Sequence, residues 1–227
     1  HATIRRQRQM CIRDSCYPPG RMAELSVCLI SFNEERKIED CLRSVADVAD
    51  EIVVVDSNST DRTVEIAGRF TDRVIRQEFL GYVGQKNFAA EQASHDWILN
   101  VDCDERLSPE LIASIARLKD SLGGDTSAYE LCRRTRYVDR WLDHCWYPEY
   151  RIRLYDRTRC QWAGISLHEK LEVGSGRVER VAGDLLHLSF DSLSDHVQTL
   201  DRFTDLAADE LLQRGRRVTV LTPVVHA

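Results

Sequence analysis

The stretch LSVCLISFNEERKIEDCLRSVADVADEIVVVDSNSTD, residues 25–61, decides the fold, because it reads as a strand, a helix and a second strand in succession. Residues 25–30 and 52–55 are short apolar runs typical of buried strands. Between them, apolar residues recur at helical spacing, at Ile38, Cys41, Leu42 and Val45. Strands that alternate with helices predict a parallel sheet.

The same alternation continues along the chain. Ser59 or Thr60 can cap a helix that carries Val64, Ala67 and Phe70. Further elements are predicted as a strand at 74–75, a helix at 85–93, a strand at 97–101 and a helix that begins at Ser108-Pro109. We therefore expect an α/β fold whose mostly parallel, Rossmann-like sheet is flanked by helices.

The second half of the sequence is less regular. Alternating residues at 129–133 and 151–155 predict added strands. Six apolar residues line one long helix, at Leu193, Val197, Leu200, Phe203, Ala207 and Leu211. The 227 residues are 43% hydrophobic, which suits one sizeable core, so we expect a single domain over residues 22–227.

Residues 1–21 differ from the rest and are predicted to be a non-native or disordered leader. They carry five Arg and the turn-forming run Tyr17-Pro-Pro-Gly20 without apolar periodicity. Residues 5–15 resemble translated adapter sequence at the ends of gene assemblies, which would make Met22 the natural start. A basic tail that binds a membrane or RNA is the competing interpretation.

Charge and cysteine content narrow the function classes. Lys and Arg number 31 against 37 Asp and Glu, a net charge of −6, which disfavours binding of nucleic acid through its phosphates. Without the leader the count is 26 against 36, because the leader holds five basic residues and one acidic residue. The eight Cys form no C-x-x-C pair, so we expect reduced, buried thiols and a cytoplasmic protein. No run reaches the roughly 20 apolar residues that a membrane-spanning helix needs.

Polar residues follow three of the predicted strands. They form the runs Asn33-Glu-Glu35, Asp56-Ser-Asn-Ser-Thr-Asp61 and Asp102-Cys-Asp-Glu105. Ligands of open α/β sheets bind outside the carboxyl ends of the strands, so these runs should converge on one binding edge. Each run taken alone also fits a simple turn or helix cap.

Asp102 and Asp104 form the most specific pair of this edge. Residues i and i+2 of an extended segment point the same way, so the two carboxylates can share Mg²⁺ or Mn²⁺. Such an ion would bridge the oxygens of a diphosphate and neutralise the charge on a departing nucleotide. The alternative is that acidic residues ahead of a helix only favour its dipole.

These motifs together resemble the family 2 glycosyltransferases, which have the GT-A fold, over Met22 to about Arg217. The matching runs are Ser26–Glu35, Val54–Asp61, Gln85-Lys-Asn87 and Trp97–Glu105, the last with Cys103 where Ala is usual. Trp146–Tyr155, His168-Glu169 and Gly183–His187 are similar to the subgroup of lipopolysaccharide-core β-1,4-glucosyltransferases. The resemblance implies a nucleotide-sugar half at 22–125 and an acceptor-binding half at 126–227.

The resemblance also implies roles for single residues. Asn33, Glu34 and Asp56 would contact the uridine, and Asp102 and Asp104 would serve the metal and the diphosphate. Lys86 would add a positive charge to the phosphates, unless it is an exposed surface lysine. His187 would be a third metal ligand or an acceptor contact, unless it is a core residue.

Inverting transfer needs a base that deprotonates the acceptor hydroxyl, and Glu169 is the predicted base, with Asp143 in reserve. Partial burial would raise the pKa of Glu169 toward a useful value. The alternative is a carboxylate paired with Arg151 or Arg153. These two Arg, with Arg133 and Arg134, can instead clamp phosphates of donor or acceptor, or form a solvated face. Four aromatic residues can stack on a sugar or belong to the core, namely Trp141, Trp146, Tyr147 and Trp162.

We therefore expect a metal-dependent inverting hexosyltransferase that uses UDP-glucose and extends a glycolipid such as the lipopolysaccharide core. We also expect it at the inner face of the cytoplasmic membrane, in peripheral contact, with a truncated C-terminal end. One alternative is a nucleotidyltransferase, although Asn33-Glu34 stands where such enzymes carry a Gly- and Arg-rich loop. The other is an inactive nucleotide-binding protein, which the intact acidic pair disfavours.

Overall fold

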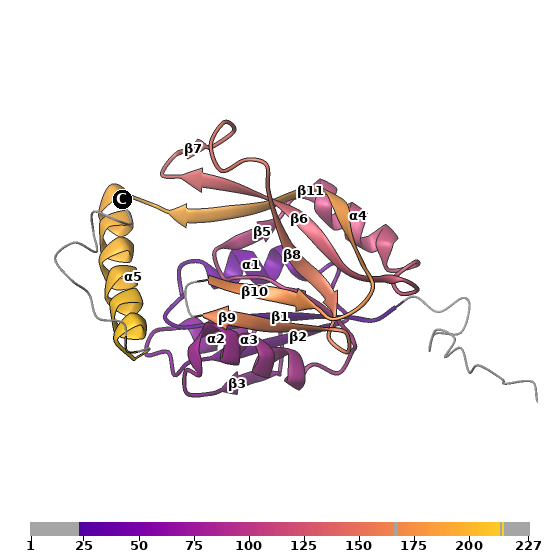
Figure 1. Ribbon diagram of the computed structural model, residues 1–227, viewed down its shortest axis with the longest axis horizontal. Coiled ribbons are helices and arrows are strands. Elements are labelled where there is room, and N and C mark those ends of the chain that lie inside the picture. The colour runs from indigo at the N-terminus through magenta and orange to yellow at the C-terminus, as the bar shows by residue number, and fades with distance from the viewer. Residues whose placement is uncertain (1–22, 166–167, 214, 216–227) are drawn as a thin grey trace, which may run out of the picture.

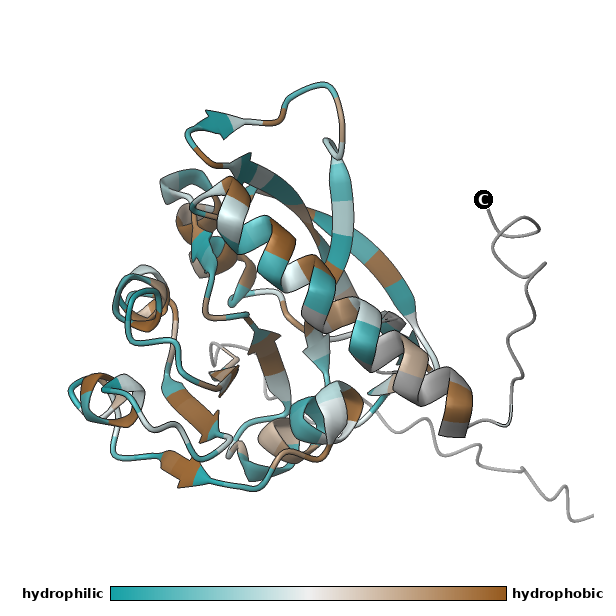
Figure 2. Ribbon diagram, turned by 90° about the vertical axis from the view of Figure 1, so that its left-hand side faces the viewer, coloured by the Kyte–Doolittle hydropathy of each residue, from teal (hydrophilic) through white to brown (hydrophobic). Residues whose placement is uncertain are grey.

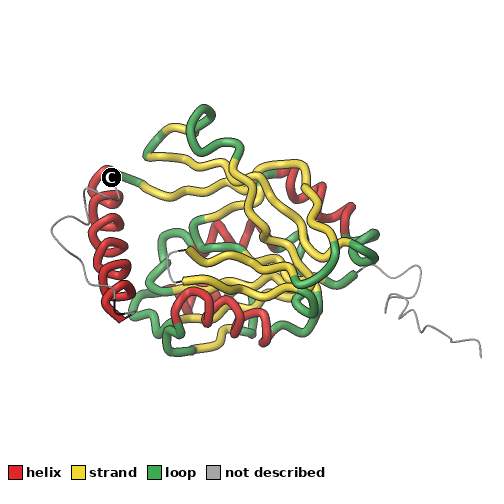
Figure 3. Tube along the Cα trace, viewed as in Figure 1, coloured by secondary structure: helices red, strands yellow, loops and turns green. Residues whose placement is uncertain are grey.

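The computed structural model describes residues 23–165, 168–213 and 215, shown in colour in Figure 1. The leader predicted at residues 1–21 and the end of the chain lie outside the described residues. A large curled sheet forms the centre, and helices cover it on two sides (Figures 1 and 3). The α/β fold expected from the sequence is confirmed.

The first half of the sheet is parallel throughout. Its strands follow the order β3-β2-β1-β4, so the strand that precedes the Asp102 segment lies beside the first strand of the chain. The elements are β1 (Leu25–Ser31), α1 (Ile38–Val45), β2 (Glu51–Asp56), α2 (Thr63–Ala67), β3 (Val74–Arg76), α3 (Gly81–Gln92) and β4 (Trp97–Asn100). Their carboxyl ends lie on one edge, as the sequence predicts.

The second half extends the same sheet with mixed pairing, in the order β4-β8-β6-β11-β5. The strand β8 is antiparallel to both of its neighbours, β4 and β6, whereas β11 runs parallel to β6 and antiparallel to β5. The elements are β5 (Glu105–Leu107), α4 (Pro109–Leu118), β6 (Thr126–Tyr137), β7 (Arg140–Trp141), β8 (Glu149–Asp156), β9 (Cys160–Ile165), β10 (His168–Val173), β11 (Arg177–Phe190) and α5 (Leu193–Gln213). The hairpin of β9 and β10 forms a separate two-stranded sheet.

The core has two layers because successive side chains of a strand point to opposite faces. Leu25, Val27 and Leu29 of β1 pack with α1, α2 and α4 on one face. Cys28 of the same strand packs with α3 and the hairpin on the other face. The hairpin thus covers the sheet next to α3, close to the carboxyl ends of the strands.

Five strands were not predicted, namely β5, β7, β9, β10 and β11. The longest of them, β11, has the sequence RVERVAGDLLHLSF, which lacks regular alternation, and its pairing with β6 is interrupted by three register shifts. Its position is therefore set by backbone pairing with β6 rather than by a two-residue apolar period. The Ser108 cap of α4 is confirmed, since its hydroxyl accepts from Leu111 N at 3.2 Å.

The long helix α5 is confirmed, but the first three apolar residues of its stripe do not face the core. Leu193, Val197 and Leu200 are all at least 60% exposed. Figure 2 shows α5 in front of the sheet, with hydrophobic and hydrophilic residues alternating along it. Within the part of the chain that the structure describes, no helix is both long and apolar enough to cross a membrane.

Candidate active site

Two loops at the carboxyl edge of β1 and β2 are joined by hydrogen bonds. Asn33 N donates to Ser59 Oγ at 2.8 Å, and Thr60 N donates to Asn33 Oδ1 at 2.9 Å. Glu34 N donates to Thr63 Oγ1 at 2.7 Å. The side chain of Asn33 therefore braces the loops, whereas Glu34 lines the cavity beside them.

Asp56 supports these loops from inside the protein. Its Oδ1 accepts hydrogen bonds from Ser31 Oγ at 3.1 Å and Ser59 Oγ at 2.5 Å, and its Oδ2 accepts from Ser59 N at 2.8 Å. The residue is completely buried. Both carboxylate oxygens of Asp56 are buried, so they are not exposed for the uridine contact predicted for this residue. Ser57 and Asn58 line the cavity instead.

A cavity of about 1120 Å³ lies over this edge. Phe32, Glu34 and Asn58 line one side, and the Asp102 to Asp104 segment lines another. The hairpin contributes Trp162 and Glu169. Parts of β11 and α5 complete the wall, with His187, Phe190, Thr199 and Phe203. The cavity therefore brings together residues from both halves of the sequence.

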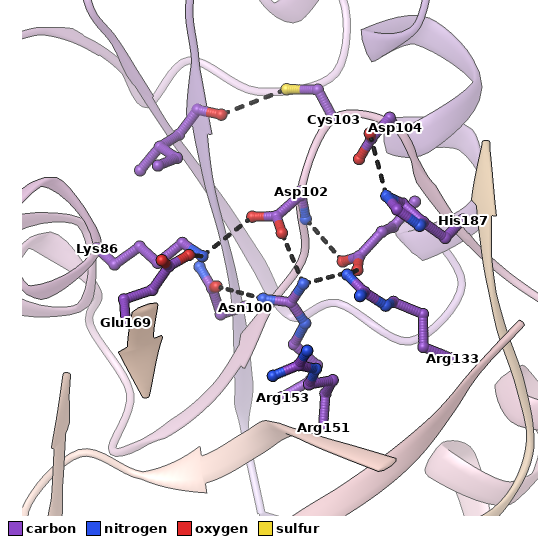
Figure 4. Close-up of polar contacts among 12 residues, drawn as sticks. Lys86, Asn100, Asp102, Cys103, Asp104, Arg133, Arg151, Arg153, Glu169 and His187 are labelled. Atoms are coloured by element: carbon purple, nitrogen blue, oxygen red, sulfur yellow. Dashed lines mark hydrogen bonds and ion pairs between the residues drawn. The ribbon is translucent and has the colours of Figure 1, made fainter. Parts of the chain in front are cut away.

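Asp102 is held between two cations (Figure 4). Arg153 Nη2 lies 2.6 Å from its Oδ2, and Lys86 Nζ lies 3.4 Å from its Oδ1. Burial alone would raise the pKa of Asp102, but the charges of Arg153 and Lys86 outweigh it and hold that pKa well below its usual range. Asp102 therefore stays ionised, with both oxygens already engaged.

Glu105 and Arg153 form a buried brace beneath Asp102. Arg153 Nη2 lies 2.6 Å from Glu105 Oε1, and Asp102 N donates to Glu105 Oε2 at 3.0 Å. Arg153 Nη1 also approaches Asn100 Oδ1 at 3.4 Å, while its Nε has no hydrogen-bond partner. Burial raises the pKa of Glu105. Arg153 is buried among these groups and also lines the cavity, so the donor contact predicted for it stays a prediction.

Asp104 contacts His187, whereas Asp102 contacts the two cations (Figure 4). The extended conformation expected from Asp102 to Asp104 is not found, because the chain turns after Asp102, with Glu105 N bonded to Asp102 O at 2.9 Å. Asp104 Oδ2 lies 3.3 Å from His187 Nε2. The other ring nitrogen, Nδ1, lies 3.2 Å from Thr135 Oγ1, which orients the imidazole.

Asp104 and His187 suit a divalent cation that is also bound by a ligand. One carboxylate oxygen and one imidazole nitrogen face the cavity together, and Mg²⁺ or Mn²⁺ commonly takes its other ligands from water and substrate phosphates. The described residues contain no cluster of three or more His, Cys, Asp or Glu that could hold a metal ion. Asp102 is the least suited of the three predicted ligands, because Arg153 and Lys86 already occupy its oxygens.

Glu169 is paired with Lys86 and not with the two Arg that the sequence suggested. Lys86 Nζ lies 3.1 Å from Glu169 Oε1 and 4.6 Å from the centre of the Trp162 ring. Lys86 is itself only 2% exposed, so it is not a surface lysine. Glu169 reaches the cavity from β10, at the side opposite His187 in Figure 4.

The reserve base Asp143 is placed elsewhere. It forms an ion pair with Arg134 Nη2 at 2.6 Å in the segment that follows β7, and it does not line the cavity. Arg133 and Arg151 do line the cavity and share the carboxylate of Glu149, at 2.7 Å and 2.6 Å. Of the four predicted aromatic residues, only Trp162 is among the residues lining the cavity.

Sequence reasoning missed several residues of this site. Phe32, Ser57, Glu105 and Thr135 were given no separate role, although the motifs that contain the first three were recognised. The sequence indicates for Glu105 only a favourable charge ahead of a helix, and the contact with Arg153 is seen only in the structure. Thr135 lies 52 residues from His187, so no local pattern connects them.

Comparison with known proteins places this arrangement in a family. Residues 26–168 match the model of the family described as Glycosyl transferase family 2. The chain belongs to glycosyl transferase family 2. The match covers β1 to the start of β10, and so includes the acidic edge and ends one residue before Glu169.

Relatives in this family extend the comparison over most of the chain. An uncharacterized glycosyltransferase of Rickettsia typhi is 32% identical over 206 residues, which cover 86% of this chain and 70% of that protein. The lipopolysaccharide core biosynthesis glycosyltransferase LpsC of Rhizobium meliloti is 30% identical over 220 residues, 89% of this chain and 78% of that protein. This family 2 chain is therefore a glycosyltransferase.

One solved structure shares the fold. Mannosyl-3-phosphoglycerate synthase from Rubrobacter xylanophilus superimposes with a TM-score of 0.53 at 17% identity, over 87% of this chain and 77% of that chain. At this identity the likeness concerns the fold alone, and it agrees with the GT-A architecture. Membership of family 2 also favours glycosyl transfer over nucleotidyl transfer, the alternative reaction that the sequence alone allowed.

Proposed function

We propose that this enzyme is a metal-dependent inverting hexosyltransferase that transfers glucose from UDP-glucose to a glycolipid acceptor such as the lipopolysaccharide core. The observation that supports it most is the Asp104–His187 pair at the carboxyl edge, where a nucleotide diphosphate of a family 2 donor would lie. The similarity to LpsC supports the choice of acceptor class.

The nucleoside would lie against the loops after β1 and β2. Phe32 offers an exposed aromatic face, and Glu34, Ser57 and Asn58 offer acceptors and donors for a base or ribose. Asn33 and Asp56 would act indirectly by fixing these loops. Arg151, which is half-exposed and lines the cavity, remains a proposed phosphate or sugar contact.

Asp104 and His187 would hold Mg²⁺ or Mn²⁺ together with the donor diphosphate. When bound, the cation neutralises charge on the departing diphosphate. Asp102 would not bind the cation directly but would add its negative charge nearby. Arg153 and Lys86 hold its carboxylate in place. A negative carboxylate near the cation also strengthens its binding.

Glu169 is the proposed base. Its carboxylate would accept the proton of the acceptor hydroxyl while that oxygen forms a bond to the anomeric carbon. As this bond forms, the bond from the anomeric carbon to the diphosphate breaks, and the nucleotide leaves with the electron pair. Attack from the side opposite the leaving group inverts the configuration. The position of Glu169 across the cavity from His187 supports this division of roles.

An acceptor in a membrane would require contact of the enzyme with the inner face of the cytoplasmic membrane. The exposed apolar residues Leu193, Val197 and Leu200 of α5 support such peripheral contact. The long helix also borders the cavity through Thr199 and Phe203. A membrane-bound acceptor could thus approach along α5.

A panel of nucleotide sugars tests this function by donor hydrolysis with and without Mn²⁺. We expect UDP-glucose to be the best substrate, turnover to require the cation, and Asp104→Asn to lower it by at least about 100-fold. Asp102→Asn should also lower turnover, because it releases Arg153 and Lys86 into the site. Metal-independent turnover, or an active Asp104→Asn variant, would contradict the metal role.

A further inference from the structure

Three consecutive residues of α3 each contact a different part of the active site. Gln85 Nε2 donates to Ser57 Oγ at 3.1 Å, at the loop proposed for the nucleoside. Lys86 reaches the Asp102 segment and β10, and Asn87 reaches β9. Consecutive side chains of a helix differ by about 100° in direction. Three neighbouring residues of one turn of α3 can therefore contact three different parts of the site.

Asn87 fastens the hairpin of β9 and β10 to the helix. Its Nδ2 donates to Trp162 O at 2.9 Å, and its Oδ1 accepts from Trp162 N at 3.0 Å. The side-chain amide thus pairs with a strand residue much as a neighbouring strand would. Because the hairpin is hydrogen-bonded as a sheet of its own, these two bonds attach its backbone to α3.

Lys86 ties the same hairpin to the acidic edge. Its buried ammonium lies between Asp102 Oδ1 at 3.4 Å and Glu169 Oε1 at 3.1 Å, over the Trp162 ring. A buried ammonium is strongly destabilised without partners, so the two carboxylates and the cation keep one another in place. Glu169 Oε2 receives no hydrogen bond from the residues that the structure describes, which leaves that oxygen for the cavity.

We propose that Lys86 and Asn87 are positioning residues that set Glu169 of the hairpin at a fixed place opposite the donor edge. The inference rests on the proposed function, in which Glu169 is the base. It also changes the role predicted for Lys86, whose charge is directed at two carboxylates instead of a phosphate. Negative and positive side chains thus alternate from Glu169 through Lys86 to Asp102. The series continues into the core through Arg153 to Glu105.

Hydrogen exchange tests the attachment without any substrate. Asn87→Leu should speed exchange of the β9 and β10 amides by about tenfold, with β1 unchanged, because one to two hydrogen bonds are lost. Lys86→Met should do so mainly in β10. Lys119→Met is the matched control, since Lys119 is also a largely buried lysine paired with a carboxylate, Asp50 at 2.5 Å, outside the cavity. Unchanged hairpin exchange in Asn87→Leu and Lys86→Met would overturn the proposal.

Donor hydrolysis tests what the attachment does, with the best nucleotide sugar of the panel. Lys86→Met and Asn87→Leu should each lower kcat by at least about tenfold while KM for the donor stays within about threefold. In the double variant Lys86→Met/Glu169→Gln the losses should not add, because both act through one carboxylate. A raised KM with unchanged kcat would make Lys86 a donor ligand and overturn the inference.

Different variants test Glu169 as the base and Lys86 and Asn87 as positioning residues. If Glu169→Gln keeps full turnover, the base assignment of the proposed function is wrong, whatever the hairpin does. If Glu169→Gln is inactive but Lys86→Met and Asn87→Leu keep full kcat, the base stands and the positioning role is wrong. Hydrogen exchange decides the attachment even if no donor in the panel is hydrolysed.

Discussion

Arg153 is the residue on which the charges of the site depend most. It lies buried between Asp102 and Glu105, with 2.6 Å contacts to each. Removing one partner of a buried ion pair leaves an uncompensated charge, which costs about 3–5 kcal/mol. We therefore expect Arg153→Met to lower the free energy of unfolding by about this amount, measured by urea denaturation.

Arg151→Met provides the matched control for this prediction. Arg151 lies two residues earlier on β8, is about half exposed and pairs with Glu149 at the surface of the cavity. Exposed ion pairs contribute little, so this variant should lose no more than about 1 kcal/mol. Equal losses in the two variants would show that the Arg153 brace does not stabilise the fold.

Glu51 gives a pH dependence away from the active site. It accepts from Ser26 Oγ at 2.5 Å and from Ser94 N at 2.7 Å. Burial alone would raise the pKa of Glu51, but the hydrogen bonds from Ser26 and Ser94 and the charge of Arg73 lower it. A lowered folded pKa stabilises the protein above the unfolded pKa of about 4.3, and this stabilisation is lost as pH falls through the folded value.

The wild type should therefore exceed Glu51→Gln in stability by about 1–2 kcal/mol at pH 7, because charged hydrogen bonds are replaced by neutral ones. The difference should shrink progressively below about pH 4.3. Denaturant unfolding from pH 7 to pH 3 measures it. A difference that stays constant over this range would contradict the lowered pKa.

At the scale of elements, Gly183 sets the packing of β11 on α4. Its φ is +101°, and a Cβ there would lie 2.4 Å from Leu111 N and 2.6 Å from Leu111 Cα. Gly183→Ala should lower the free energy of unfolding by at least about 2 kcal/mol, from backbone strain and overpacking combined. Displacement of β11 should also weaken cation binding, because His187 lies four residues further on this strand.

Gly123→Ala separates backbone strain from overpacking, since Gly123 has φ of +121° but no atom within 4 Å of an added Cβ. Its loss of stability should come from backbone strain alone. Thermal unfolding of both variants measures the difference. A loss in Gly183→Ala no larger than in Gly123→Ala would mean that the contact with α4 is not tight.

Helices and strands whose apolar residues form a regular local pattern were predictable from the sequence. Strands that depend on contacts with residues far away in the sequence were not. The runs of β1 and β2 and the helical spacing of α1 determine their structure locally. The hairpin β9–β10 and the strand β11 instead depend on contacts with α3 and β6. The helical period of α5 is clear in the sequence, but it does not show that Leu193, Val197 and Leu200 face solvent.

Over the whole molecule, the family motifs predicted residues that line one cavity, but not the partners of those residues. Asp102, Asp104, Glu169 and His187 come together around one cavity although they span 86 residues of sequence. Their partners were not predictable, because Arg153, Lys86 and Thr135 approach from other elements. A two-residue spacing alone could not show that the chain turns between the two Asp.

The proposed function depends most on the binding of the catalytic cation by Asp104 and His187 together with a nucleoside diphosphate. Electron paramagnetic resonance of free Mn²⁺ in the presence of UDP tests it directly, since bound Mn²⁺ leaves the free signal. We predict that Asp104→Asn and His187→Ala each weaken Mn²⁺ binding by at least about tenfold, within the range seen for changes around metal sites. Binding in both variants equal to that of the wild type would contradict the claim.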